Sequence, residues 1–171
     1  KSGDIRTFAW HNGLIRDKSG RVTGTLSSGE DITERRRVER SLVESESKYR
    51  NLVETAHELI WKCDAFGRLV YLNPAWEVTH GYAVSEMIGH SFGDFQRPEI
   101  FERDMSELVR HMRDGGAVRD YETTHIAKDG SEVSLVFNSM ALRDSDGKIV
   151  GLQGTAIDVT KRKRAEEALR Q

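Results

Sequence analysis

The sequence predicts a mixed α+β protein in which helices cover one face of an antiparallel sheet. Three observations predict it: an internal repeat, a hairpin pattern before a helical region, and a strand meander after that region. The 171 residues, 37% of them apolar, are enough for one packed domain with residues left over. The 26 basic and 28 acidic side chains nearly cancel to a net charge of -2, which gives no indication of a nucleic-acid partner.

The repeat relates residues 1–44 to residues 128–171 without a gap, so that residue 1 aligns with residue 128. Both copies carry Arg-Asp, two glycines and Asp-x-Thr at equivalent positions, and a run of charged residues follows in each. Self-similarity of this length predicts a repeated structural unit. We therefore expect the chain to be a piece of a longer protein, with one whole unit preceded by the last third of another.

Each copy predicts two strands, a turn and the start of a helix. β-branched and aromatic residues favour the strands, and Asp-x-x-Gly favours the turn between them. The expected strands cover residues 5–15 and 22–29 in the first copy and 133–142 and 149–157 in the second. The pairs Asp31 and Thr33, and Asp158 and Thr160, precede the charged runs and are candidates for helix N-caps.

The first charged run predicts a helix with a heptad seam. The seam consists of Val38, Leu42, Ser45, Tyr49, Leu52 and Ala56. One interpretation is an amphipathic helix packed on its own domain, and the other is a parallel coiled coil in a dimer. The spacing alone leaves both open.

A hairpin and several helices are predicted between the two copies. Strands over 59–64 and 67–72 flank an Asp-x-x-Gly turn. Asn73 is expected to cap the helix that follows, and Pro74 suits its first turn. Later segments are a helical stretch over 99–114 and a strand over 118–126.

Five short motifs succeed one another through the rest of the chain. They are D-x-x-G-R-L-V-Y-L-N-P-A at 64–75, G-Y at 81–82, E-x-I-G at 86–89, K-D-G at 128–130 and D-x-T at 158–160. With these motifs the chain resembles the PAS family over roughly residues 46–160. The resemblance implies a five-stranded antiparallel sheet with strand order 2-1-5-4-3, whose concave face and helices enclose a small cavity.

The resemblance also divides the chain. The expected segments are the closing strands of a preceding PAS unit, or PAC motif (1–33), a linker helix (34–57), a complete PAS domain (58–160) and the start of the next linker helix (161–171). It implies a cytoplasmic sensory module of a sensor histidine kinase or cyclic-dinucleotide regulator, with an output domain beyond residue 171. In such a module we expect Asp31, Thr33, Asp158 and Thr160 to relay a signal between sheet and helix. We expect a homodimer formed through the linker helix and PAS surfaces. The alternative is a ligand-free PAS dimerisation or spacer module.

The two common chromophores of the family are not expected here. Flavin-binding relatives carry a reactive Cys in an Asn-Cys-Arg-Phe motif, where this chain has Gly-His-Ser-Phe. They also carry Asn or Gln at the positions of His125, Leu135 and Ala156. Haem-binding relatives carry an axial His where this chain has Met105, and His111 lies almost two turns away. We therefore predict a colourless protein with no haem or flavin, in which an unidentified small molecule can occupy the cavity.

Strand alternation selects the residues of a candidate ligand pocket. They are Trp61, Cys63, Trp76, Phe92, Met105, Leu108, Tyr121, Thr123, His125, Leu135, Phe137 and Ser139, with Phe95 and Met112 also available from the helices. Aromatic and Met clusters usually fill cores, so packed core remains an open interpretation. The polar members Tyr121, Thr123, His125 and Ser139 favour a pocket, because buried polar groups need partners.

No catalytic chemistry is indicated. His57-Glu58-Leu59 resembles the phospho-acceptor box of histidine kinases, but a strand pattern follows and no Gly-rich ATP site does. The six histidines lack metal-ligand spacing. No apolar run approaches the ~20 residues of a membrane span. We therefore expect a non-enzymatic segment without a metal, nucleic-acid or membrane partner.

Overall fold

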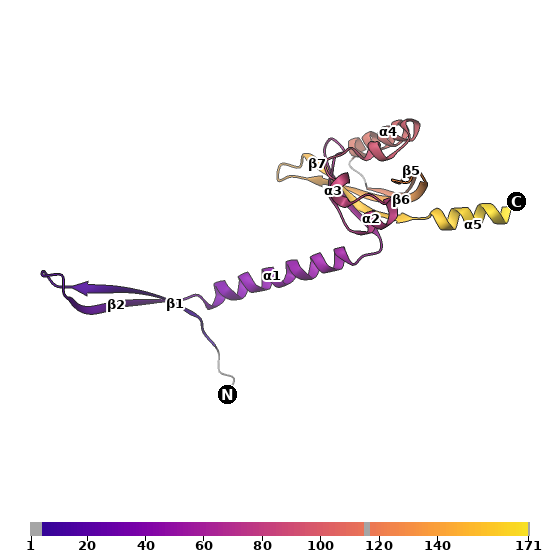
Figure 1. Ribbon diagram of the computed structural model, residues 1–171. Helices are drawn as coiled ribbons and strands as arrows, with labels where there is room; N and C mark the ends of the chain where they lie inside the picture. The colour runs from indigo at the N-terminus through magenta and orange to yellow at the C-terminus, as the bar shows by residue number, and fades with distance from the viewer. Residues whose placement is uncertain (1–4, 115–116, 171) are drawn as a thin grey trace. The chain divides into compact units, whose positions relative to one another are not determined.

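The computed structural model describes residues 5–114 and 117–170. The chain forms two compact units, Lys1–Arg50 and Asn51–Gln171. The first holds the hairpin of β1 (Phe8–Arg16) and β2 (Val22–Asp31), followed by most of helix α1 (Thr33–Glu54) (Figure 1). The strands pair antiparallel, as the first copy of the repeat predicts.

Side-chain hydrogen bonds fix both ends of this hairpin. At the turn, Asp17 Oδ1 accepts from the backbone N–H groups of Ser19 and Arg21, at 2.8 and 3.0 Å. At the open end, Asp31 Oδ1 accepts from the N–H of Thr33, and Thr33 Oγ1 accepts from the N–H of Thr7. No described residue of the first unit is buried. The exposed apolar side chains of the hairpin are Ile5, Phe8, Trp10, Leu14, Ile15, Val22 and Leu26.

Helix α1 is shorter than the predicted linker helix. It ends at Glu54, so Ala56, the last residue of the predicted seam, follows the helix. The other apolar seam residues, Val38, Leu42, Tyr49 and Leu52, are exposed.

The second unit contains a five-stranded antiparallel sheet among its described residues. The strands are β3 (Leu59–Asp64), β4 (Leu69–Leu72), β5 (Val118–Ile126), β6 (Glu132–Arg143) and β7 (Ile149–Asp158). Their order is β4-β3-β7-β6-β5, which confirms the predicted order. The last strand, β7, is central and pairs with both β3 and β6.

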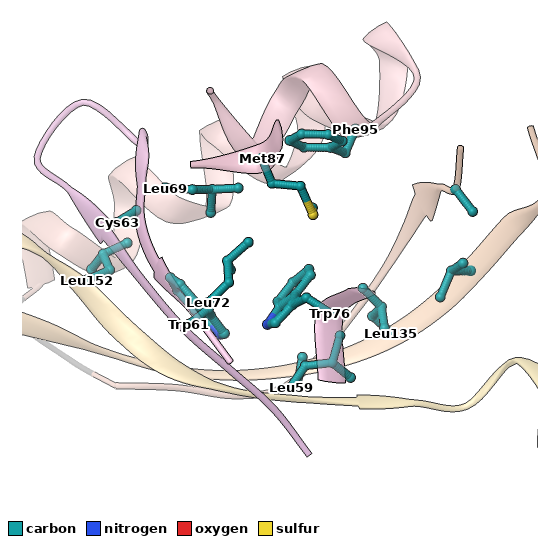
Figure 2. Close-up of a cluster of buried hydrophobic side chains, with 13 residues drawn as sticks. Leu59, Trp61, Cys63, Leu69, Leu72, Trp76, Met87, Phe95, Leu135 and Leu152 are labelled. Atoms are coloured by element: carbon teal, nitrogen blue, oxygen red, sulfur yellow. The ribbon is translucent and has the colours of Figure 1, made fainter. Parts of the chain in front are cut away.

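Helical segments join β4 to β5 and cover the inner face of the sheet. They are α2 (Ala75–His80), α3 (Val84–Met87), the 3-10 helix η1 (Phe92–Phe95) and α4 (Pro98–Asp114). Trp76, Met87 and Phe95 from these segments point toward the inward side chains of β3 and β4 (Figure 2). Helix α5 (Thr160–Arg170) begins where β7 ends. None of the helices in the described residues is both long and apolar enough to cross a membrane.

Asn73 does not cap α2, which corrects the prediction. The residue before α2 is Pro74, and no side chain caps the helix. The fully buried Asn73 side chain joins three segments instead. Its Oδ1 accepts from the N–H of Ile60, and its Nδ2 donates to the carbonyls of Val53 and Glu58. Carbonyls at a helix C-terminus lack intrahelical partners, so this contact satisfies one of them just before α1 ends.

Candidate ligand cavity

A cavity of about 90 Å³ lies between the inner face of the sheet and the helical segments. Ten of the twelve predicted pocket residues line it: Trp61, Cys63, Trp76, Phe92, Leu108, Tyr121, Thr123, His125, Phe137 and Ser139. The additional member Phe95 lines it as well. The period-2 rule therefore places seven of its eight strand residues in the wall, and the strand residues Leu69, Val118 and Leu152 line the cavity as well.

Two predicted pocket residues lie elsewhere. Leu135 is fully buried, but it packs in the core beside Leu59 and Trp76 rather than in the cavity wall (Figure 2). Met105 is half-buried and does not line the cavity. Asp104 and Leu108, four residues apart, face the cavity, so a residue next to Asp104 is rotated by roughly 100° around the helix. The structure describes only the backbone of His111 and Met112, so the prediction for Met112 lies outside the described side chains.

Three polar wall residues were missed from the sequence: Gln96, Asp104 and Glu107. The signal for Asp104 was present. A carboxylate four residues before Leu108 falls on the apolar face of an amphipathic helix, where an unpaired charge is costly. Such a position predicts partners on a neighbouring strand. Gln96 lies between two helical segments and carries no comparable pattern.

Asp104 is the centre of a buried hydrogen-bond network, with a side chain only 7% exposed. Its Oδ1 accepts from the Tyr121 hydroxyl at 2.7 Å and from Arg103 Nη2 at 2.8 Å. Its Oδ2 accepts from Gln96 Nε2 at 2.7 Å and from the Thr123 hydroxyl. Burial alone would raise the pKa of Asp104, but these hydrogen bonds outweigh it and hold the pKa below 3.8. The carboxylate is therefore ionised at neutral pH.

Two histidines form a buried pair, of which His125 lines the cavity and His80 does not. His80 Nε2 and His125 Nδ1 are 3.1 Å apart, and the Trp76 ring stacks on His80 at 4.8 Å between ring centroids. Burial lowers the pKa of both imidazoles well below 6.5, and charge on His80 would lower that of His125 further. Both rings are therefore neutral at pH 7, and the N–H of one ring donates a hydrogen bond to the bare nitrogen of the other.

The remaining wall residues offer binding rather than reaction. Burial raises the pKa of the Cys63 thiol to about 11, so it is a poor nucleophile at neutral pH. Trp61 Nε1 is buried and has no hydrogen-bond partner among the described residues. Within the same residues, no group of three or more His, Cys, Asp or Glu side chains could hold a metal ion. The wall is thus mainly apolar with a few polar groups, as in small-molecule sites.

The predicted relay residues Asp158 and Thr160 connect the sheet to α5. Asp158 Oδ1 accepts from the N–H of Thr160 at 2.8 Å. Thr160 Oγ1 accepts from the N–H of Ser134 on β6 at 2.9 Å. The first turn of α5 is therefore bonded to two neighbouring strands. One turn later, Lys163 Nζ donates to Glu122 on β5 at 2.5 Å.

Comparison with known proteins identifies the fold and the family. A family model described as PAS fold matches residues 47–159, more than half of the chain, and the chain therefore belongs to the PAS family. Among solved structures, a PAS domain from Colwellia psychrerythraea covers 67% of this chain and 97% of its own, with a TM-score of 0.62 and 21% identity.

Curated relatives are sensor proteins much longer than this chain. Sporulation kinase C of Bacillus subtilis is 25% identical over 146 residues, 81% of this chain and 33% of the kinase. The C4-dicarboxylate transport sensor protein DctS of Rhodobacter capsulatus is 27% identical over 138 residues, 80% of this chain and 21% of that protein. The chain thus spans a third or less of these two relatives, and its similarity is to PAS sensory regions of sensor kinases.

Proposed function

We propose that this chain is the sensory and signal-relay part of a cytoplasmic multidomain signalling protein, and that its cavity binds a small molecule. One observation carries the proposal: two residues that line the cavity, Gln96 and Trp61, each have a buried polar atom, Oε1 and Nε1, without a partner in the described part of the chain. Native proteins leave few such atoms unpaired, and a ligand can supply the missing partners. The fragment itself carries out no catalysis, and any kinase or cyclase-type activity belongs to another part of the parent protein.

The ligand of this proposal is neither flavin nor haem. Leu135 and Ala156, which stand where flavin-binding relatives carry amides, are fully buried and apolar. The polar edge of a flavin would meet them without a hydrogen bond, which is costly. His125, the third position, is bonded to His80. An absorbance spectrum of the purified protein tests this proposal: a visible band near ~450 nm for flavin or ~400 nm for haem would overturn it.

Signal relay runs through the start of α5. A ligand can shift an equilibrium only if it binds two conformations with different affinity. The bonds of Asp158 and Thr160 fix the helix start to the sheet, so a change in the strands would alter the direction of α5. Asp31 and Thr33 would act in the same way for α1. The pair Lys163–Glu122 adds a contact from α5 to a cavity-lining strand.

The relay is tested in the parent protein with Asp158→Ala. The variant loses a cap but keeps its core, so it should fold while its output no longer responds to the stimulus. Ser19→Ala in the exposed hairpin turn serves as the control. Output that remains fully regulated in Asp158→Ala would overturn the relay assignment.

The exposed seam of α1 supports a second candidate, a ligand-free dimerisation module. Val38, Leu42, Tyr49 and Leu52 are apolar, exposed and spaced at 4, 7 and 3 residues, as in a coiled coil. The occupant we propose is α1 of a second copy. Native mass spectrometry tests it: a dimer that becomes monomeric in Leu42→Glu supports the candidate, and a wild-type monomer overturns it.

A further inference from the structure

The Asp104 carboxylate fixes the direction of the hydrogen bonds at its end of the cavity. An ionised carboxylate accepts hydrogen bonds and cannot donate them. The hydroxyls of Tyr121 and Thr123 therefore donate to it. Gln96 Nε2 uses its two hydrogens on Asp104 Oδ2 and on Thr123 Oγ1, at 2.7 and 2.9 Å. None of these three side chains has a hydrogen left to offer a ligand.

The group left without a partner at the Asp104 end of the cavity is a hydrogen-bond acceptor. Because Gln96 Nε2 must face the carboxylate, the amide oxygen turns away from it, and the network excludes the flipped amide. Gln96 Oε1 is buried and has no hydrogen-bond partner in the residues that the structure describes, although Gln96 lines the cavity. A buried acceptor without a partner is unfavourable. An O–H or N–H group of a ligand would satisfy it.

The charge of the wall restricts the ligand further. The described lining residues include two carboxylic side chains, Asp104 and Glu107, and no Lys or Arg, and the buried His125 is neutral. Arg103 and Arg110, their basic partners, are outside the wall. An anionic ligand would lose its hydration and meet like charge, and both effects oppose binding.

We propose that the cavity takes a small, neutral, mainly apolar molecule that donates an O–H or N–H hydrogen bond to Gln96 Oε1, of the class of phenols and primary amides. The cavity of about 90 Å³ is larger than one water requires and smaller than a site for drug-sized molecules, so it restricts the ligand to a small molecule. The inference rests on the proposed ligand-binding function and names the ligand class. This ligand class excludes from the cavity the kind of dicarboxylate for which the relative DctS is named.

Two matched pairs of probes test the class on the whole chain at pH 7. Phenol has a hydroxyl group where toluene has a methyl group. Benzamide is a neutral hydrogen-bond donor, whereas benzoate is an anion. Titrations followed by NMR of the cavity residues give each Kd in the wild type and in Gln96→Met. Gln153→Met, on β7 outside the cavity wall, is the matched control.

We expect benzoate to bind at least about tenfold more weakly than benzamide. Gln96→Met should weaken phenol binding about tenfold and leave the toluene Kd within about twofold, because only phenol uses the amide oxygen. Gln153→Met should change neither Kd.

Any other result would overturn either the ligand class or the ligand-binding function. Benzoate binding as tightly as benzamide, or equal losses for phenol and toluene in Gln96→Met, would overturn the ligand class while the ligand-binding function stands. The benzamide and benzoate comparison needs no variant, so it decides even if Gln96→Met fails to fold. If none of the four probes shifts the cavity signals, the ligand-binding function fails, and the inference fails with it.

Discussion

The two copies of the repeat have the same hydrogen bonds and opposite burial. Residue Thr7 bonds to Thr33 in the first copy, and the aligned Ser134 bonds to Thr160 in the second. The Asp17 turn has its counterpart in the Asp144 turn, which accepts from the N–H groups at 146 and 148. Both hairpins even shift register at the same aligned position.

The two copies differ in the burial of their inward strand residues. Phe8 in the first copy is 46% exposed, whereas the aligned Leu135 is fully buried. The second copy has β3 beside it and helical segments across its inner face, and no described residue of the first unit is buried. The residues within each copy therefore determine its hairpin and its caps. The stability of the second copy comes from its packing against the residues that precede it, β3 and the helical segments.

The largest effect should separate the copies at Leu135 and Phe8. Leu135→Ala opens a cavity in a closed core and should lower the free energy of unfolding by about 2–5 kcal/mol. Phe8→Ala should change it by less than about 0.5 kcal/mol, because the ring is half exposed. Urea unfolding followed by circular dichroism measures both. Similar losses for the two variants would mean that the hairpin has a buried partner.

Acid should destabilise the complete domain through its buried histidine pair. The lowered pKa values mean that the unfolded chain takes up protons first as the pH falls below 6.5. At pH 5 each histidine should then lower the free energy of unfolding by about 2 kcal/mol relative to neutral pH. This stability is regained as the pH rises through 6.5.

Substitution of one histidine checks this pH dependence. His125→Gln should reduce the loss of stability between pH 7 and pH 5 by about half. His11→Gln, in the exposed hairpin, should leave the loss unchanged. An unaltered pH dependence in His125→Gln would refute the assignment to the pair.

The aligned glycines Gly151 and Gly24 give a sharper comparison of the backbone. A Cβ on Gly151 would clash with the carbonyl oxygen of Cys63 on β3, whereas one on Gly24 would meet only Ile15 Cδ1 at 3.9 Å. Gly151→Ala should therefore cost about 1–3 kcal/mol, and Gly24→Ala less than about 0.5 kcal/mol. Thermal unfolding of the two variants decides, and equal melting temperatures would contradict the close approach of β3 and β7.

The smallest effect should come from the caps. Asp158→Ala removes one side-chain bond to a helix N–H, worth about 1 kcal/mol, so the melting temperature should fall by only a few degrees. Asp31→Ala should leave the unfolding of the second unit unchanged. A domain that fails to fold without Asp158 would show that the residue is structural and would remove the basis for its relay role.

The sequence predicted local and periodic features and missed those that depend on side-chain networks. The strands, the turns and the sheet order followed from alternation, from glycine positions and from family motifs. Asn73 is not the predicted helix cap. Either a local cap or a long-range hydrogen bond to Ile60 would use the same side-chain amide, and the sequence does not distinguish the two. The sequence did not predict the role of Asp104, because its partners Thr123 and Tyr121 lie on β5. The residue pattern of α4 does not show which strand that helix faces. Leu135 was placed on the correct face, but its distance along the strand puts it beside the cavity.

The central place of β7 also sets the order in which this domain can be made. Residues 149–158 are synthesised after every strand that they join, and β3 and β6 do not pair with each other but each pairs with β7 between them. A nascent chain that ends before residue 149 therefore has two separate strand pairs, β3–β4 and β5–β6, each with an open edge. Closure of the sheet is a late, long-range step that completes the core and positions α5 in the same event.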